Sequence, residues 1–350
     1  MNEIPVIGII GGGMIAQIAH LPFYLSDSRC RVAAIAEFRP SLVAALTGAV
    51  GNAAIVADHD ELLKDPAIDA VVISVPRSAT GPITLAALEA GKHVMTEKPM
   101  AHTVEQAERL VGAGRARDLI YAIGYMKRYD PGIEAARQAF GSLLEAQALG
   151  PLLFANFYNY SRNYAHPPPL HVRPAESRDV RFETWPLWPE WIAEPHRDTY
   201  AWFMNHGSHD VNLMSYFLGH DLTVADAGLL PHQGGLRASL RSGDVPVSLI
   251  VAKTDTGRWT EGAEFLFENG RLVIAVPSPM DRDAVTRMVI ETEIDGLPAQ
   301  HIEVGQGWSF ARQAKGFVDC LLGEATPATD GETGRRDLAL CEAIWQRVAA

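Results

Sequence analysis

The pattern of apolar and polar positions differs between the two parts of the chain. Over residues 1–125, short apolar runs alternate with segments whose apolar residues recur at helical spacing, which is typical of a parallel sheet covered by helices on both faces. The predicted strands are 6–10, 31–36, 70–75, 93–96 and 120–124, and the predicted helices are 14–25, 40–46, 82–90 and 104–117. The pattern predicts an α/β domain with a doubly wound sheet.

From residue 126 onward, apolar runs follow one another through short turns such as Glu268-Asn269-Gly270-Arg271, so we expect a mostly antiparallel sheet. The predicted strands are 152–160, 224–230, 236–241, 245–253, 263–268, 271–275, 287–292 and 301–304, and the predicted helices are 133–147, 211–218, 308–322 and 335–348. The sequence therefore predicts one domain at 1–125 and a second, α+β domain at 126–350.

Residues 161–200 are rich in proline, tryptophan, histidine and arginine, with Trp185, Trp188 and Trp191 three residues apart. A long segment without regular structure inside a compact domain is usually functional or disordered, and the aromatic residues argue against disorder. We consider a lid that stacks on a sugar ring or covers a cofactor, and an arm that packs against a neighbouring subunit. One segment could serve both roles.

The run Gly11-Gly12-Gly13-Met14-Ile15-Ala16 stands between the first strand and the first helix. Gly11 allows a tight turn, Gly13 lets backbone N–H groups approach a pyrophosphate, and the small Ala16 lets the helix pack on the strand. The anion would lie at the start of the helix, where unpaired N–H groups favour negative charge. This spacing alone can also mark an ordinary turn, but the flanking strand and helix favour a dinucleotide site.

Glu37 ends the second predicted strand, where a carboxylate could accept hydrogen bonds from the adenosine ribose. Its negative charge would repel a 2′-phosphate, which favours NAD. Arg39 could pair with that phosphate, so NADP remains the alternative cofactor.

Composition narrows the function classes further. A chain of 350 residues with 47% hydrophobic residues can form two cores, and a formal charge of −12 gives no surface for nucleic acid. The three scattered cysteines predict neither a disulfide framework nor a metal site, and they fit a cytoplasmic protein. We find no leader and no apolar run of the roughly 20 residues that cross a bilayer, so we expect no membrane partner.

Several motifs together resemble the Gfo/Idh/MocA family, which includes glucose-fructose oxidoreductases and inositol dehydrogenases. They are the glycine turn, Glu97-Lys98-Pro99, Gly124-Tyr125-Met126-Lys127-Arg128-Tyr129-Asp130-Pro131 and Gly207-Ser208-His209. The resemblance implies a Rossmann domain followed by an open-faced antiparallel sheet, with substrate held between that sheet and the nicotinamide. It also implies a homodimer or homotetramer that pairs through the sheet.

The resemblance also implies roles for individual residues. In such enzymes the lysine of the Glu-Lys-Pro motif lies beside the nicotinamide and the reacting hydroxyl, and a histidine one helical turn after an aspartate exchanges the proton. The matching positions are Lys98 and His209, with Asn205 in place of the aspartate. Lys98 would stabilise negative charge on the substrate oxygen. If Ser208 or a neighbour opens the helix, its dipole would keep His209 neutral and therefore basic.

Asn205 departs from the family pattern because an amide cannot pass a proton onward, although its carbonyl can fix the histidine tautomer. Three alternatives follow. His209 acts alone, or Asp210 or His206 compensates, or the reaction is not a simple dehydrogenation.

Further residues are predicted to contact the cofactor or the substrate. Lys127 is expected to reach substrate hydroxyls, Arg128 to brace the domain junction, and Asn212 stands where family members often carry a second acid. The predicted cofactor contacts are Gly11, Gly13, Met14, Ile15, Ala16, Glu37, Val75, Pro76, Glu97 and Lys98, and the predicted substrate contacts are Lys127, Asn156, Tyr158 and Trp188.

These expectations predict an NAD(P)-dependent oxidoreductase that acts on a secondary hydroxyl or ketone of a sugar, cyclitol or sugar derivative. Two alternatives stay open. One is a sugar lyase or glycosidase that oxidises its substrate transiently with bound NAD, and the other is a non-catalytic dinucleotide-binding regulator of the same fold.

Overall fold

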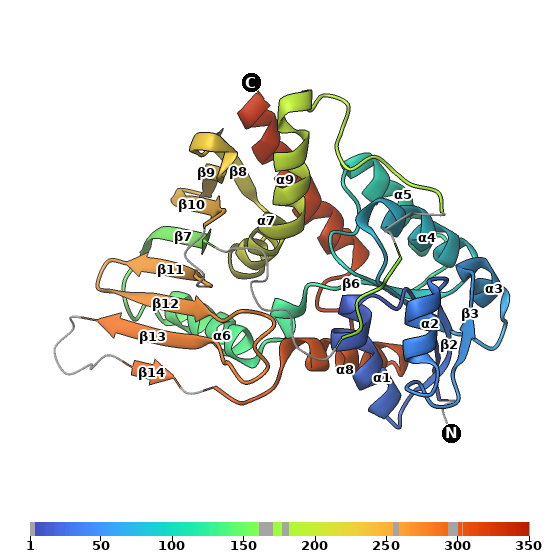
Figure 1. Ribbon diagram of the computed structural model, residues 1–350. Helices are drawn as coiled ribbons and strands as arrows, with labels where there is room; N and C mark the ends of the chain where they lie inside the picture. Colours follow the sequence, from blue (N-terminus) through green and yellow to red (C-terminus); the bar gives the residue numbers. More distant parts are fainter. Residues whose placement is uncertain are drawn as a thin grey trace. The chain divides into compact units, whose positions relative to one another are not determined.

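The computed structural model describes residues 4–160, 171–176, 182–254, 259–292, 300–302 and 304–349 (Figure 1). The chain forms two compact units, each with its own sheet. The first unit is made of Met1–Met126, Pro168–Pro189 and Phe310–Leu338, and the second of Lys127–Pro167, Glu190–Ser309 and Ala339–Ala350. The chain therefore returns to its first unit twice after residue 126.

The first unit is built on a parallel sheet. In the described chain it has six strands in the order β3-β2-β1-β4-β5-β6. They are β1 Val6–Ile10, β2 Arg31–Ala36, β3 Ala54–Val56, β4 Ala70–Ile73, β5 His93–Thr96 and β6 Tyr121–Ile123. This is the strand order of a doubly wound dinucleotide-binding sheet, whose order reverses between β1 and β4. The predicted fold class is confirmed.

Helices and short helical turns connect these strands. They are the π-helix Ala16–His20, α1 Leu21–Ser26, α2 Pro40–Leu46, α3 His59–Lys64, α4 Arg77–Glu89 and α5 Val104–Arg115. Short β3 and α3 escaped prediction because few residues carry their pattern. The predicted start of α4 was wrong. The sequence placed it at Pro82, but the helix begins at Arg77 and Pro82 lies inside it.

The predicted helix 14–25 is not regular. Residues Ala16–His20 are π-helical, and the N–H of Leu21 donates to the carbonyl of Ala16, five residues earlier. Pro22 follows directly and has no N–H with which to continue an α-helical ladder, so the wider turn accommodates it.

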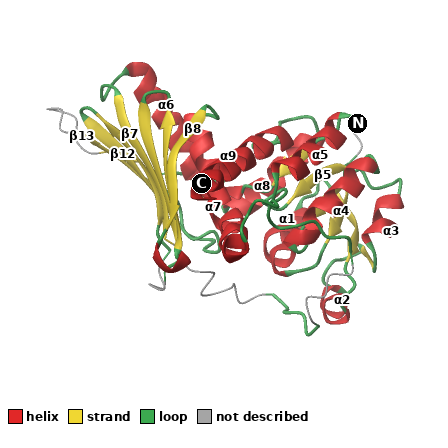
Figure 2. Cartoon of the chain, turned by 90° about the horizontal axis from the view of Figure 1, so that it is seen from above, coloured by secondary structure: helices red, strands yellow, loops and turns green. Residues whose placement is uncertain are grey.

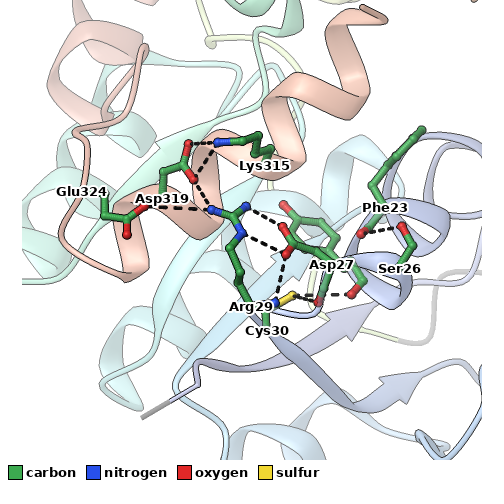
Figure 3. A network of polar contacts seen from close by, with 9 residues as sticks. Phe23, Ser26, Asp27, Arg29, Cys30, Lys315, Asp319 and Glu324 are labelled. Carbon is green, nitrogen blue, oxygen red and sulfur yellow. Dashed lines mark hydrogen bonds and ion pairs between the residues drawn. The ribbon is translucent and has the colours of Figure 1, made fainter. Parts of the chain in front are cut away.

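A helix from near the carboxyl end, α8 Ser309–Leu321, completes the core of the first unit. Its Phe317 and Val318 pack in one buried cluster with Ile7 and Ile9 of β1. Figure 3 shows how the same helix is attached through Arg29. The Arg29 guanidinium contacts Asp319 of α8 and Asp27 at 2.6 Å each, and Lys315 contacts Asp319 at 2.8 Å.

The second unit is built on a mostly antiparallel sheet, seen nearly edge-on in Figure 2. Among the described residues it has eight strands in the order β14-β13-β12-β11-β7-β10-β9-β8, and only β7 and β10 run parallel. They are β7 Leu152–Tyr160, β8 Leu222–Leu229, β9 Gly235–Ser242, β10 Val245–Ala252, β11 Glu261–Phe267, β12 Gly270–Val276, β13 Arg287–Thr292 and β14 Gln300–Ile302. The predicted open-faced sheet is confirmed.

Helices α6 Pro131–Ala146 and α7 Arg197–Leu218 cover one face of this sheet. Phe140 of α6 and Phe217 of α7 meet Phe265 of β11 with ring centroids 4.3 and 5.0 Å apart. In β7, Phe157 and Asn159 are buried on this helix-covered face. The residues that alternate with them, such as Asn156 and Tyr158, lie on the open face.

The prediction of 211–218 for α7 was wrong at the amino end, because the helix begins at Arg197. The polar run from Asn205 to Ser208 interrupts the apolar periodicity and suggests a loop, yet these residues continue the helix. The last helix, α9 Gly331–Ala349, contributes residues to both units. No helix in the described part of the chain is both long enough and apolar enough to cross a membrane.

Candidate dinucleotide and acid–base site

The glycine turn lies at the carboxyl end of β1, beside β4, at the reversal of strand order. Gly11 has φ +96°, and a Cβ there would stand 2.2 Å from the carbonyl oxygen of Ser74, so only glycine fits. A Cβ on Gly13 would meet only an Arg39 nitrogen at 3.9 Å within the described structure. The backbone at Gly13 is therefore open to a ligand, and the turn fits a pyrophosphate.

Glu37 and Arg39, which the sequence offers as alternatives, are bonded to each other. The Glu37 carboxylate accepts from the Arg39 side chain, Nε at 2.8 Å and Nη2 at 2.6 Å, and from the Gly12 N–H at 2.9 Å. Burial raises the pKa of Glu37, but the hydrogen bonds from Arg39 and Gly12 lower it below its usual value overall. Glu37 is therefore ionised, and it links the glycine turn to β2.

The other predicted cofactor residues of the first unit are arranged around this turn. Val75 lies beside Gly11, and Pro76 precedes α4. Ala16 is fully buried at the start of the π-helix, whereas Met14 and Ile15 before it are half-buried.

Glu97 follows β5 and has a partner that the sequence did not reveal. Its Oε1 lies 2.9 Å from Nε2 of His20, whose side chain is 1% exposed, at the end of the π-helix. The sequence pattern could not predict this pair, because the two residues are far apart in the chain and only the fold brings them together. The contact connects the Glu-Lys-Pro segment to the helix that follows the glycine turn.

Lys98 is half-buried and precedes a cis peptide bond to Pro99. Its charge acts on His102 nearby. Burial, followed by the positive charges of Arg77 and Lys98, lowers the pKa of His102 to about 3. His102 is therefore neutral at physiological pH, and Lys98 and Arg77 are the cations near it.

In the second unit, His209 and Asn205 lie one turn apart in α7, on the same side of the helix. His209 is 9% exposed and stands in the interior of the helix. The expectation that a helix amino terminus keeps it neutral is wrong, because the dipole acts only within the first and last turns. His206 stacks on Trp202 at 5.0 Å between ring centroids.

A buried cluster that the sequence did not predict surrounds Asp210. Lys127 forms an ion pair with Glu261, and the two residues are 5% and 2% exposed. Asn159 donates to Asp210 at 3.2 Å, and Trp259 donates to Glu261 at 3.0 Å.

Asp210 in this cluster is a neutral acid. Burial, together with the negative charge of Glu261, raises its pKa well above the usual value, against the opposing effect of Lys127. One lysine faces two carboxyl groups here, so a shared proton balances the charge.

Arg128 and Asn212 bind each other beside this cluster. Arg128 Nε donates to the Asn212 side-chain oxygen at 3.0 Å, Nη2 donates to its carbonyl at 3.1 Å, and the guanidinium lies 4.9 Å from the Tyr216 ring centroid. Asn212 thus holds Arg128 against α7.

The predicted substrate contacts do not gather in one place. Lys127 is paired with Glu261, on the helix-covered face of the sheet. Asn156 and Tyr158 lie on the open face, because they alternate with Asn159, which contacts α7. Strand alternation separates them from His209.

The predicted lid at 161–200 is only partly described, since 161–170 and 177–181 lie outside the described residues. Trp188 is half-buried in a segment of the first unit. Trp185 packs on Gly81 of the same unit, whereas Trp191 meets Tyr200 of the second unit with ring centroids 6.5 Å apart.

Within the described residues, Asp58, His59 and Asp60 have potential metal-ligand atoms within 4.8 Å of one another. Asp58 caps α3 by accepting from the Asp60 N–H. Neighbouring exposed acids at a helix cap are ordinary, and the prediction of no metal stays a prediction.

Comparison with known proteins agrees with the dinucleotide-binding fold observed in the first unit. Residues 6–125 match the Gfo/Idh/MocA oxidoreductase family, described as an NAD-binding Rossmann fold. Levoglucosan dehydrogenase from Pseudarthrobacter phenanthrenivorans is 28% identical over 154 residues, 42% of this chain and 38% of that protein. The scyllo-inositol 2-dehydrogenase (NAD(+)) of Bacillus subtilis is 25% identical over 201 residues, 57% of this chain and 49% of that protein.

The fold likeness extends further than the sequence likeness. A 3-ketoreductase from Actinomadura kijaniata, solved with NADP and TDP-benzene, is 22% identical, with a TM-score of 0.76 over 98% of both chains. The matches to the two dehydrogenases span less than half of their lengths.

The match over residues 6–125 confirms the predicted resemblance to the Gfo/Idh/MocA oxidoreductase family and the predicted cofactor class, NAD or NADP.

Proposed function

We propose that this protein is an NAD(P)-dependent oxidoreductase that transfers a hydride between nicotinamide and a secondary hydroxyl or ketone of a sugar, cyclitol or sugar derivative. The observation that carries the proposal is the glycine turn at the strand-order reversal, with Glu97 and Lys98 following β5 in the same sheet. Ligands of doubly wound sheets bind at the carboxyl ends of the strands around this reversal.

The bound dinucleotide supplies the hydride acceptor, and the protein supplies position and proton transfer. In the proposed mechanism Lys98 donates a hydrogen bond to the substrate oxygen and stabilises its negative charge during hydride transfer. His209 accepts the hydroxyl proton in oxidation and returns it in reduction.

Among the alternatives for Asn205, the structure favours His209 as the sole proton acceptor. Asp210 is a neutral acid engaged with Asn159 and Glu261, so it offers no negative charge to an imidazolium. His206 is stacked on Trp202. Asn205, one helical turn before His209, carries no charge that could stabilise an imidazolium.

The substrate class rests on the relatives. Levoglucosan and scyllo-inositol appear in the names of two of them, and the Actinomadura enzyme is called a 3-ketoreductase. All three names describe redox chemistry at hydroxyl or ketone groups of rings, which supports the same class for this chain.

The test is incubation of the purified protein with NAD or NADP and a panel of sugars and inositols, with absorbance of the reduced cofactor as the readout. Lys98→Ala should lower kcat by about a hundredfold or more while NADH binding persists. Lys64→Ala, at an exposed lysine of α3, is the matched control and should leave both unchanged.

Other outcomes separate the rival functions. Retained NAD with substrate turnover but no steady-state NADH release would indicate a lyase or glycosidase with transient oxidation. Dinucleotide binding with no turnover of any substrate would indicate a regulator.

We propose that the protein pairs with a second copy through the open face of its second sheet. Tyr158 and Tyr160 stack there at 5.4 Å, and Leu266 is 41% exposed on the same face. Light scattering should give twice or four times the mass of one chain, and a monomer would contradict the proposal. The three cysteines are all buried, in keeping with a reducing cytoplasm as the proposed location.

A further inference from the structure

A segment from the middle of the chain lies on the first unit. We call residues 171–176 and 182–189 the arm, which belongs to that unit although it follows β7 of the second. Val172 exchanges two hydrogen bonds with Gln17, whose amide accepts from the Val172 N–H at 2.8 Å and donates to its carbonyl at 3.1 Å. Gln17 lies in the helix that follows the glycine turn.

Aromatic contacts hold the far end of the arm. The ring of Phe182 packs edge-on against that of Phe38, with the ring centroids 5.5 Å apart. Phe38 is the residue that follows Glu37 in the chain. The backbone of Trp185 donates to the carbonyl of Ser78 at 2.8 Å, and its ring lies 4.7 Å from the Arg109 guanidinium.

Three of these anchoring residues, Gln17, Phe38 and Ser78, follow the carboxyl ends of β1, β2 and β4, the edge of the sheet where a dinucleotide binds. The described arm is therefore attached along the cofactor-binding edge.

The arm also presents a carboxylate near the end of β2. Glu176 accepts from the Ser41 N–H at 2.8 Å and from the Ser41 hydroxyl, and the Ala175 N–H donates to that hydroxyl at 3.0 Å. The Ser41 hydrogen bonds, more than the nearby charge of Arg39, lower the pKa of Glu176. Glu176 is therefore ionised at neutral pH.

Two carboxylates thus face one guanidinium at the end of β2. Glu37 already occupies both Arg39 Nε and Nη2, and Glu176 occupies the donors of Ser41. A phosphate monoester carries about −1.5 to −2 charges at neutral pH, so it would enter a region with one excess negative charge, where Arg39 Nε and Nη2 and both donors of Ser41 are already bonded. A ribose 2′-hydroxyl is neutral and meets no such repulsion.

We propose that Glu176 is a cofactor-selecting residue, which disfavours the 2′-phosphate of NADP and so directs the site toward NAD. This inference rests on the proposed dinucleotide-binding function. It assigns to a residue of the arm, far from the Rossmann motifs in sequence, part of the discrimination that the sequence pattern attributes to Glu37 alone.

The test measures dissociation constants of NADH and NADPH by calorimetry, without substrate, for the wild type and for Glu176→Gln. Gln keeps the side-chain length and an acceptor but removes the charge. The wild type should bind NADH more tightly than NADPH. The variant should bind NADPH about fivefold more tightly than the wild type, and NADH within about twofold.

Glu183→Gln is the matched control, because Glu183 is an exposed arm carboxylate whose partner is the Trp185 indole N–H at 3.3 Å. It removes the same charge away from Ser41 and should change neither constant. The gain of Glu176→Gln should shrink in about 0.5 M salt, where screening acts within a few ångströms.

Three results would overturn the inference. They are tighter NADPH than NADH binding by the wild type, an unchanged NADPH constant in Glu176→Gln, and an equal change for both cofactors, which would make the arm a cover without selectivity. A wild type that binds neither cofactor would instead refute the proposed function.

Discussion

The buried ion pair of Lys127 and Glu261 gives the sharpest stability prediction. Lys127→Met removes the cation and leaves two carboxyl groups, Glu261 and Asp210, in a site where they are each 2% exposed. An ionised carboxylate cannot be buried there without its cation except at large cost, so the variant must bury one more proton on folding than the wild type. Protonating a carboxyl of ordinary pKa, about 4.3, costs about 3.7 kcal/mol at pH 7 and about 1 kcal/mol at pH 5.

The opposite substitution should be milder. In Glu261→Gln the remaining Lys127 can pair with Asp210, which loses its proton when the competing carboxylate is gone. We expect a loss of about 1–2 kcal/mol, compared with about 3–5 kcal/mol for a buried charge left without a partner. The double variant should be destabilised by less than the sum of the two single variants.

The assay is urea unfolding followed by far-UV circular dichroism at pH 7 and pH 5, with the shifted transition assigned to the second unit. Lys127→Met should lose about 4 kcal/mol at pH 7 and clearly less at pH 5. Equal losses at the two pH values, or strict additivity in the double variant, would refute the reasoning.

Two further predictions concern single positions. Gly11→Ala should abolish measurable NADH binding and lower the melting temperature by several degrees, because the added Cβ would stand 2.2 Å from the Ser74 oxygen at φ +96°, and wild-type affinity would contradict this. The pKa of Asp210 is raised in the folded protein, so the folded state holds a proton that the unfolded chain releases above about pH 3.9. The stability of the wild type therefore falls as pH rises, by at most about 1.4 kcal/mol per pH unit. Asp210→Asn removes this proton, and melting curves from pH 4.5 to 8 should show a flatter dependence than the wild type, whereas parallel curves would count against a protonated Asp210.

The sequence was sufficient for every described strand of the first sheet except the short β3, because the others are apolar runs separated by turn residues. Strands 6–10, 31–36 and 93–96 agree with β1, β2 and β5 to the residue. The glycine turn could be placed because Gly11 needs a backbone conformation that other residues rarely adopt.

The sequence failed where burial of polar groups decides the structure. Helix α7 contains the run Asn205 to Ser208, whose first two residues are half-buried and whose last two are buried, so the apolar period breaks while the helix continues. The Lys127 and Glu261 pair joins residues far apart in the chain, and each alone is an ordinary surface residue type. No local pattern contains such a contact, because only the packed sheet and helix bring the partners together.

The position of α8 in the chain has a consequence for synthesis. The strands β1 to β6 leave the ribosome long before Phe317 and Val318, which fill the same core as Ile7 and Ile9. Until α8 emerges, the nascent sheet presents an uncovered apolar surface, the kind of surface that chaperones bind. The first unit therefore completes its folding only near the end of translation, and a chain cut after residue 126 would be prone to aggregate.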